Sequence, residues 1–146
     1  MTTTLTFRPA TQADWPAIQR LLQAAQLPTD GASDHLDAFI VGDTGTELLC
    51  AGGLELYGQA ALLRSVVVAA QHQGQGLGDQ LHRQIAELAR TRRIDTLYLL
   101  TTTAAQYFAR RGFQEVDRAS VPSALQASRE FQGACPASAT LMACSL

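Results

Sequence analysis

One stretch near the middle of the chain, residues 66–81, limits the possible folds more than any other. It begins with the β-branched run Val66-Val67-Val68 and continues into a polar loop that contains Gly74, Gly76 and Gly78. An amphipathic segment follows from Leu77. Runs of β-branched residues favour buried strands, and apolar residues spaced three and four apart favour a helix. The stretch therefore predicts a strand, a glycine loop and a helix in direct succession.

The glycine loop has the properties of an anion-binding turn. Glycine permits positive φ angles and close approach of the backbone to an anion, and a helix N-terminus adds free N–H groups and a positive dipole end. A P-loop would end in Gly-Lys-Ser/Thr, whereas this loop ends in Gly78-Asp79-Gln80. A Rossmann loop has a different spacing, Gly-x-Gly-x-x-Gly. The loop therefore predicts a phosphate site of another type, and a turn without a ligand is the structural alternative.

The rest of the chain predicts a single α/β domain. Its 146 residues suffice for one domain with a core of its own. Apolar runs predict strands at residues 5–9, 38–42, 47–57, 60–68, 94–101, 113–116 and 139–144. Helical spacing and capping residues predict helices at residues 14–25, 77–90 and 104–111, with short turns at 34–36 and 123–127. Gly52 and Gly53 in the third strand predict a bulge or a close backbone approach.

Composition and charge exclude several classes of protein. A net charge of −2 argues against a general nucleic-acid binder. No apolar run approaches the roughly 18–20 residues that cross a membrane, and the first residues lack the pattern of a signal peptide. The three cysteines have no metal-ligand spacing. We therefore expect a cytoplasmic protein with reduced thiols, no bound metal, and no nucleic-acid or membrane partner.

The spacing of the glycine loop resembles that of a known cosubstrate loop. Gln73-x-x-Gly76-x-Gly78 matches Gln/Arg-x-x-Gly-x-Gly/Ala, the acetyl-CoA pyrophosphate loop of the GCN5-related N-acetyltransferases (GNAT). Residues 107–113, Tyr-Phe-Ala-Arg-Arg-Gly-Phe, resemble the family's Leu/Phe-Tyr-x-x-x-Gly-Phe. The predicted order of strands and helices is also that of the family. The resemblance implies an α/β fold with one GNAT domain over residues 1–146, in which about four helices flank a mixed, mostly antiparallel sheet of about seven strands.

The resemblance also implies that acetyl-CoA is the cosubstrate. The pantetheine arm would pair with the strand before the loop and pass beside the short helix at 104–111. The implied acetyl-CoA-binding residues are Val66, Val67, Val68, Gln73, Gly74, Gln75, Gly76, Leu77, Gly78, Asp79, Thr101, Ala104 and Phe108. Thr101 stands where the family often has an Asn, and capping of the short helix is the structural alternative for its hydroxyl.

The catalytic residues implied by the resemblance depart from the family pattern. In the family a free amine attacks the thioester carbonyl directly, assisted by a base and by a backbone N–H. Phe108 replaces the usual general acid, a tyrosine, so Tyr107 is the candidate, with a core aromatic as the alternative. Leu62 replaces the glutamate that often opens the central strand, so Glu55 is the candidate base, with a raised pKa. A glutamate on the solvent face is the alternative for Glu55.

The acceptor end of the central strand carries an arginine. Arg64 is a candidate to grip an acceptor carboxylate through two hydrogen bonds, together with Ser65 and Thr102. The alternative for Arg64 is a structural ion pair with Glu55 across the hairpin. His72 and His82 flank the glycine loop and are expected to be exposed rather than catalytic.

Several segments, among them Leu62-Leu63-Arg64-Ser65, Ser128-x-Glu130-Phe131 and Cys135-Pro136-x-Ser138-Ala139, resemble the arsenic-resistance-associated N-acetyltransferases more closely. This resemblance implies a small-molecule amine acceptor, either amino-acid-like or organoarsenical. A CoA-binding sensor or interaction module without catalysis is the alternative, favoured by the departures at positions 62 and 108. Acetylation of a protein amine would need a peptide groove, and the small size argues against it. Many relatives are dimers, so a homodimer through the Phe131 region and the closing strand is a further hypothesis.

Overall fold

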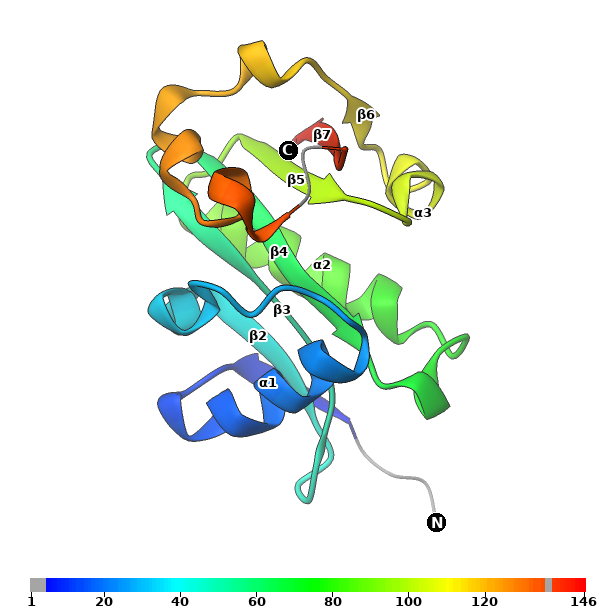
Figure 1. Cartoon of the computed structure of the whole chain (residues 1–146). Coiled ribbons are helices and arrows are strands. Elements are labelled where there is room, and N and C mark those ends of the chain that lie inside the picture. The colour runs from blue at the N-terminus through cyan, green and yellow to red at the C-terminus, as the bar shows by residue number, and fades with distance from the viewer. Residues whose placement is uncertain (1–4, 136–137) are drawn as a thin grey trace.

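The chain forms one seven-stranded mixed sheet. In this computed structural model, which describes residues 5–135 and 138–146, the strand order is β1-β2-β3-β4-β5-β7-β6 (Figure 1). The strands are β1 (Thr6–Pro9), β2 (Phe39–Asp43), β3 (Leu48–Tyr57), β4 (Ala60–Val68), β5 (Thr96–Thr101), β6 (Gln114–Glu115) and β7 (Thr140–Ser145). Neighbouring strands are antiparallel except β4 and β5, which are parallel. Pro136 and Ala137, which belong to one of the motifs above, lie outside the described residues.

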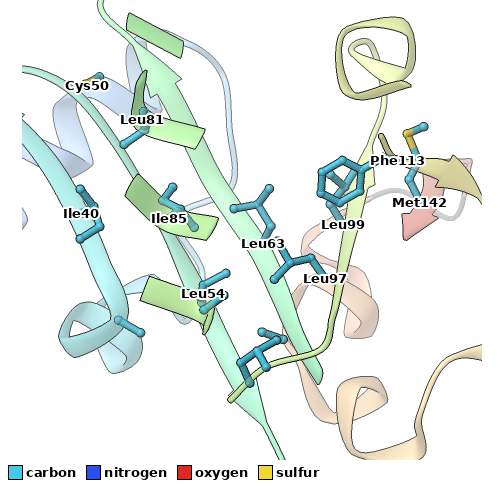
Figure 2. Close-up of a cluster of buried hydrophobic side chains, with 14 residues drawn as sticks. Ile40, Cys50, Leu54, Leu63, Leu81, Ile85, Leu97, Leu99, Phe113 and Met142 are labelled. Carbon is cyan, nitrogen blue, oxygen red and sulfur yellow. The ribbon is translucent and has the colours of Figure 1, made fainter. Parts of the chain in front are cut away.

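Two α-helices cover opposite faces of the sheet (Figure 1). Helix α1 (Trp15–Ala24) packs Ile18 and Leu22 against Phe39 on one face. Helix α2 (Leu77–Thr91) lies on the other face, where its Leu81 and Ile85 pack against strands β3 and β4 (Figure 2). Successive side chains of a strand point to opposite faces, so the central strands supply both layers of the core.

The second half of the chain adds a third core cluster. Helix α3 (Ala105–Ala109) follows β5. Short helical turns complete the structure: η1 (Gln12–Asp14), η2 (Ala32–Ala38), η3 (Ala70–His72), η4 (Arg118–Ser120), η5 (Ser123–Ala127) and η6 (Glu130–Ala134). Val121 and Leu125 bury Leu62 and Leu141, so the segment between β6 and β7 covers β4, β5 and β7. Among the described residues, no helix has the length and apolar character needed to cross a membrane.

The predicted fold class and the predicted order of elements are confirmed. The strand expected at 113–116 is shorter, at Gln114–Glu115, because Phe113 turns into the core, where its ring meets Phe108 edge-on at 5.7 Å. Gly52 and Gly53 were predicted to mark either a bulge or a close backbone approach, and both are present. A Cβ on Gly53 would overlap the Phe39 ring, and the register of β3 against β4 shifts at this point.

The register shift is a β-bulge in β4 that prepares the site. Ala51 faces Val67 and Gly53 faces Arg64, so two residues of β4 stand opposite the single residue between them on β3. Ser65, at the bulge, has a positive φ of 61°, and a bulge of this kind bends the strand and increases its twist. Strand β4 pairs with β5 only over residues 60–62. The two strands therefore diverge after residue 62, before the bulge is reached.

Candidate active site

A cleft of about 1300 Å³ opens where β4 and β5 diverge. Its walls come from residues 63–68 of β4 and the bulge, the glycine loop, residues 99–104 at the end of β5, and α3. Its far end is closed by the 26–30 region and by Glu130 and Cys135. Segments far apart in the sequence therefore meet around one elongated space that has two chemically different ends.

The glycine loop forms one end of the cleft, and it lies between a strand and a helix as the sequence predicts. Gly74 and Gly76 have φ angles of 81° and 82°, and a Cβ at either position would meet no atom within 4 Å. Glycine is therefore required there by the backbone conformation rather than by crowding. The side-chain amide of Gln73 donates to the carbonyl oxygen of Val68 at 3.1 Å, which ties the loop to the end of β4.

The structure brings most of the predicted acetyl-CoA residues together. Val66 to Val68, Gln73, Gly74, Gly76 to Asp79, Thr101, Ala104 and Phe108 all line the cleft. Gln75 is exposed and is not part of the cleft wall, so its side chain lies outside the predicted set. The first turn of α2 adds free backbone N–H groups beside the loop, because the first four N–H groups of a helix have no partner within it.

Tyr107 lies over the loop rather than at the far end of the cleft. A Cβ on Gly78 would overlap the Tyr107 hydroxyl oxygen, which explains why this position of the loop is a glycine. The guanidinium of Arg111 stacks on the Tyr107 ring at 3.5 Å and pairs with Asp79. Burial raises the pKa of Tyr107. The alternative of a core or rim aromatic describes this position well, and a proton-donating role stays a prediction.

The threonines after β5 hold the turn into α3. The Thr101 hydroxyl accepts a hydrogen bond from the Ala104 N–H at 3.0 Å, so the capping-type contact considered for it is present. Thr101 and Thr102 both line the cleft, and Thr102 is exposed. Their hydroxyls therefore lie within reach of a molecule in the cleft.

Arg64 lies at the other end of the cleft, away from the glycine loop, and its side chain is fully buried. Its Nη1 donates to Glu55 Oε2 at 2.7 Å and its Nε donates to Ser65 Oγ at 3.0 Å. Within the described part of the chain, its Nη2 makes only longer contacts, 3.5 Å to the carbonyl oxygen of Pro28 and 3.6 Å to Glu130 Oε2. The ion pair with Glu55 considered as the alternative is therefore present, and Arg64 also lines the cleft.

Glu55 matches neither of the two predictions made for it, a base with a raised pKa or a glutamate on the solvent face. It is 1% exposed, so its assignment to the solvent face is wrong. Burial alone would raise its pKa, but hydrogen bonds from Tyr57 and Arg64 stabilise the carboxylate and hold the pKa below its ordinary value. The expected raised pKa is therefore also wrong. Glu55 lies behind Arg64 and does not line the cleft.

Glu130 is the ionisable residue that the sequence reasoning missed. It is 5% exposed, and it lines the same end of the cleft as Arg64. Burial raises its pKa to about 7; the nearby charge of Glu55 adds to this rise, whereas Arg64 opposes it. Glu130 follows an irregular segment, and nothing in its local spacing points toward β4. Its presence in the Ser128-x-Glu130-Phe131 motif was the only available signal.

The histidines are more buried than expected. His82 is half-buried against Phe113, with ring centroids 6.0 Å apart, and burial lowers its pKa. His72 is partly buried and lines the cleft. The three cysteines are free. No cluster of metal-ligating side chains occurs within residues 5–135 and 138–146.

Comparison with known proteins identifies the family. A model described as an acetyltransferase (GNAT) domain matches residues 34–115, more than half of the chain. The chain is 35% identical over 74 residues to an amino-acid acetyltransferase of Pseudomonas aeruginosa, a match that covers 51% of this chain and 17% of that protein. The chain therefore spans about a sixth of the length of that relative.

Solved structures share the fold. N-acetylglutamate synthase from Neisseria gonorrhoeae, complexed with coenzyme A and N-acetyl-glutamate, matches with a TM-score of 0.83 and 21% identity over 100% of this chain and 36% of that chain. Rv2747 from Mycobacterium tuberculosis, in complex with CoA, matches with a TM-score of 0.78 and 20% identity over 97% of this chain and 99% of that chain. Fold, glycine loop and family match agree, and the chain belongs to the GNAT acetyltransferase family.

Proposed function

We propose that this chain is an acetyl-CoA-dependent N-acetyltransferase that acetylates the amine of a small molecule by direct attack on the thioester. The single observation that supports this most strongly is the cleft itself. One end of it is a glycine loop at a helix N-terminus, and the other end holds buried ionisable groups. The matching region, 34–115, includes the loop and the whole of α3. We propose that residues 1–146 act as one domain.

The two ends of the cleft suit the two parts of the reaction. Backbone N–H groups of the loop and of the first turn of α2 would bind the pyrophosphate of acetyl-CoA. Strand β4 has no β5 partner after residue 62. Its Val66 to Val68 backbone would therefore pair with the pantetheine arm in the manner of an added strand. This arrangement would bring the thioester toward the bulge at Ser65, beside the buried charges.

The acceptor is proposed to be amino-acid-like. Arg64 belongs to the wall of the acceptor end, and among the described residues its Nη2 makes only contacts of 3.5 Å or longer, so Nη2 is the proposed donor to a carboxylate. A matching relative is named an amino-acid acetyltransferase, and a matching structure holds N-acetyl-glutamate. The resemblance to arsenic-resistance-associated N-acetyltransferases extends the proposal to an organoarsenical amino acid. The ammonium of such an acceptor would face the buried carboxylates.

A CoA-binding sensor is the second candidate, favoured by a specific observation. Leu62, at the usual glutamate position, is buried among Val121 and Leu125, and Glu55 does not reach the cleft. Such a protein would bind acetyl-CoA through the same loop and would show no turnover with any amine. The two candidates therefore differ only in the reaction.

The test combines binding and turnover on one sample. Calorimetry measures acetyl-CoA binding, and thiol release is followed with free amino acids, phosphinic and arsinic amino-acid analogues, polyamines and short peptides. We expect acetyl-CoA to bind and thiol release to depend on amino acids or their analogues. Binding without turnover across the panel would favour the sensor. Failure to bind acetyl-CoA would contradict both candidates.

A further inference from the structure

We propose that Glu130 is the catalytic base that removes the proton from the acceptor ammonium. This inference rests on the proposed acetyltransferase function. It assigns the role to a residue outside β4, where the usual base position holds Leu62. Glu130 instead stands at the start of η6, in the segment that closes the acceptor end of the cleft.

The position of Glu130 meets the first requirement for a base, which is access to the substrate. Its carboxyl is almost completely buried, yet the residue forms part of the cleft wall. The Ser128 hydroxyl accepts a hydrogen bond from the Glu130 N–H at 3.2 Å, and the Glu130 carbonyl oxygen accepts one from the Cys135 N–H at 3.2 Å. The backbone on both sides is thus anchored, and the side chain is held toward Arg64.

The charges around Glu130 favour a cationic acceptor. Arg64 lies between two glutamates, 2.7 Å from Glu55 and 3.6 Å from Glu130. The shorter contact directs the arginine charge mainly to Glu55, because the Coulomb energy falls with distance. When Glu130 ionises, the three groups carry a net negative charge at the cleft wall. An ammonium group arriving there supplies the missing positive charge.

The two buried glutamates, Glu55 and Glu130, have pKa values shifted in opposite directions. Glu55 is held ionised by Tyr57 and Arg64, and its depressed pKa makes it a poor proton acceptor. The pKa of Glu130, about 7, lies where a base is most effective at neutral pH. The other ionisable group in contact is Cys135, whose pKa burial raises to about 11, so it remains neutral when Glu130 titrates. Asp30 completes the cleft wall and is exposed to solvent.

The proton balance of the step is simple. The Glu130 carboxylate takes one proton from the ammonium, and the neutral amine then attacks the thioester carbonyl carbon. A C–N bond forms and the C–S bond breaks. The second N–H proton leaves with the sulfur as the free thiol. Glu130 returns its proton to solvent before the next cycle, so the reaction releases one proton overall.

The test uses Glu130→Gln, with Glu130→Asp as a milder variant and Glu87→Gln as the control. Glu87 is an exposed residue of α2 whose only described ion pair is with Arg90 at the surface. Acetyl-CoA binding is measured by calorimetry. Turnover is measured from pH 5.5 to 9 with L-glutamate and the remaining free amino acids. Carbon-13 NMR of glutamate-labelled protein follows the Glu130 carboxyl through the same pH range.

We expect Glu130→Gln to keep acetyl-CoA affinity within about twofold and to lose about 100- to 10 000-fold in kcat/KM. In the wild type kcat/KM should rise with pH through about 7. In Glu130→Gln that rise should move toward pH 9, because only the free neutral amine then reacts. Glu130→Asp should keep the midpoint near neutrality at a reduced rate, and it replaces Glu130→Gln if the latter does not fold.

Two results would overturn the inference while leaving the proposed function intact. One is a Glu130→Gln enzyme whose kcat/KM and pH profile match those of the Glu87→Gln control. The other is an NMR midpoint for Glu130 near the value of an ordinary glutamate. A wild type that binds acetyl-CoA but acetylates no amine would instead remove the proposed function, and the inference with it.

Discussion

The two ends of the cleft present different kinds of chemical group, main-chain groups at one end and side chains at the other. At the loop end the main chain provides the binding groups, and glycines at 74 and 76 adopt positive φ angles that keep it in place. At the acceptor end side chains provide them: Arg64 of β4 and Glu130 of η6 line the cleft, and Glu55 of β3 pairs with Arg64 from behind. The loop end is exposed, whereas these three side chains are almost completely buried.

This difference accounts for how each end can vary. A pyrophosphate is the same in every acetyl-CoA, so a backbone cradle serves any member of the family. An acceptor differs between enzymes, and its recognition depends on side chains that can be exchanged singly. The buried charges, unlike the loop, also cost stability unless they are paired and hydrogen-bonded. Mutations at the two ends should therefore separate cosubstrate binding from catalysis and stability.

The largest effect is expected at the loop. Gly76→Asp places a carboxylate beside the pyrophosphate at a position with a φ of 82°. Two like charges about 4 Å apart near a protein surface repel by about 4 kcal/mol, which corresponds to a roughly 1000-fold weaker affinity. Calorimetry with acetyl-CoA measures the change.

The matched control for that variant is Gly58→Asp. Gly58 also has a positive φ, 69°, and open space around it, but it lies in the hairpin turn between β3 and β4. It should bear a similar backbone cost and keep its acetyl-CoA affinity. Equal losses in the two variants would show that Gly76→Asp acts through folding.

The next largest effect is expected at Glu55. Glu55→Gln leaves Arg64 with Glu130 as its remaining carboxylate, and breaking a buried pair in this way costs about 3–5 kcal/mol of unfolding free energy. Because the charge of Glu55 raises the pKa of Glu130, its removal should also shift the midpoint of the kcat/KM profile below 7. Urea unfolding and a pH–rate profile test both effects. An unchanged stability would show that Arg64 does not depend on Glu55.

Glu130→Gln should increase stability at alkaline pH. The folded protein binds a proton at Glu130 up to a pKa of about 7, whereas an unfolded glutamate releases it near 4.5, so unfolding free energy falls as pH rises between these values. The shift from 4.5 to about 7 sets an upper limit of about 3 kcal/mol on this loss. Thermal unfolding should show that the Tm of the wild type is lower at pH 8 than at pH 5, and that the Tm of Glu130→Gln falls by less over the same pH change. Parallel decreases in both proteins would contradict the raised pKa.

The smallest effect is expected at Tyr107. Tyr107→Phe removes a hydroxyl that lies against Gly78 at the loop end. If this hydroxyl binds acetyl-CoA through one hydrogen bond, its loss costs about 0.5–1.5 kcal/mol and raises the KM for acetyl-CoA about twofold to tenfold, with kcat nearly unchanged. Tyr98→Phe on β5, half-buried in the third core cluster, serves as the control. A tenfold lower kcat with an unchanged KM would restore Tyr107 as the proton donor.

The sequence predicted the loop end almost completely because its determinants are local. Positive φ angles strongly favour glycine, so the conformation of the loop at Gly74 and Gly76 is visible in the spacing of the glycines. The strand before the loop and the helix after it appear in the apolar pattern for the same reason. The role of Gly78 was less visible, because its partner, the Tyr107 hydroxyl, lies on α3.

The acceptor end was predicted less well because its contacts are remote in sequence. Leu54-Glu55-Leu56 alternates like a strand with one solvent face, and nothing local indicates that His35 of η2 and Ser128 approach Glu55 on that face. The pairing of Glu55 with Arg64 was considered because both lie on one hairpin. Glu130 reaches the same place from a segment with no regular period, so only the three-dimensional structure brings it to the cleft.

Calorimetry of acetyl-CoA binding to Gly76→Asp and Glu130→Gln, side by side with the wild type, tests the division of the cleft most directly. We expect the wild type and Glu130→Gln to bind with affinities within about twofold of each other, because Glu130 lies at the acceptor end. Gly76→Asp should bind about 1000-fold more weakly. Full binding by Gly76→Asp, or an equal loss in both variants, would show that the two ends of the cleft do not have these separate roles.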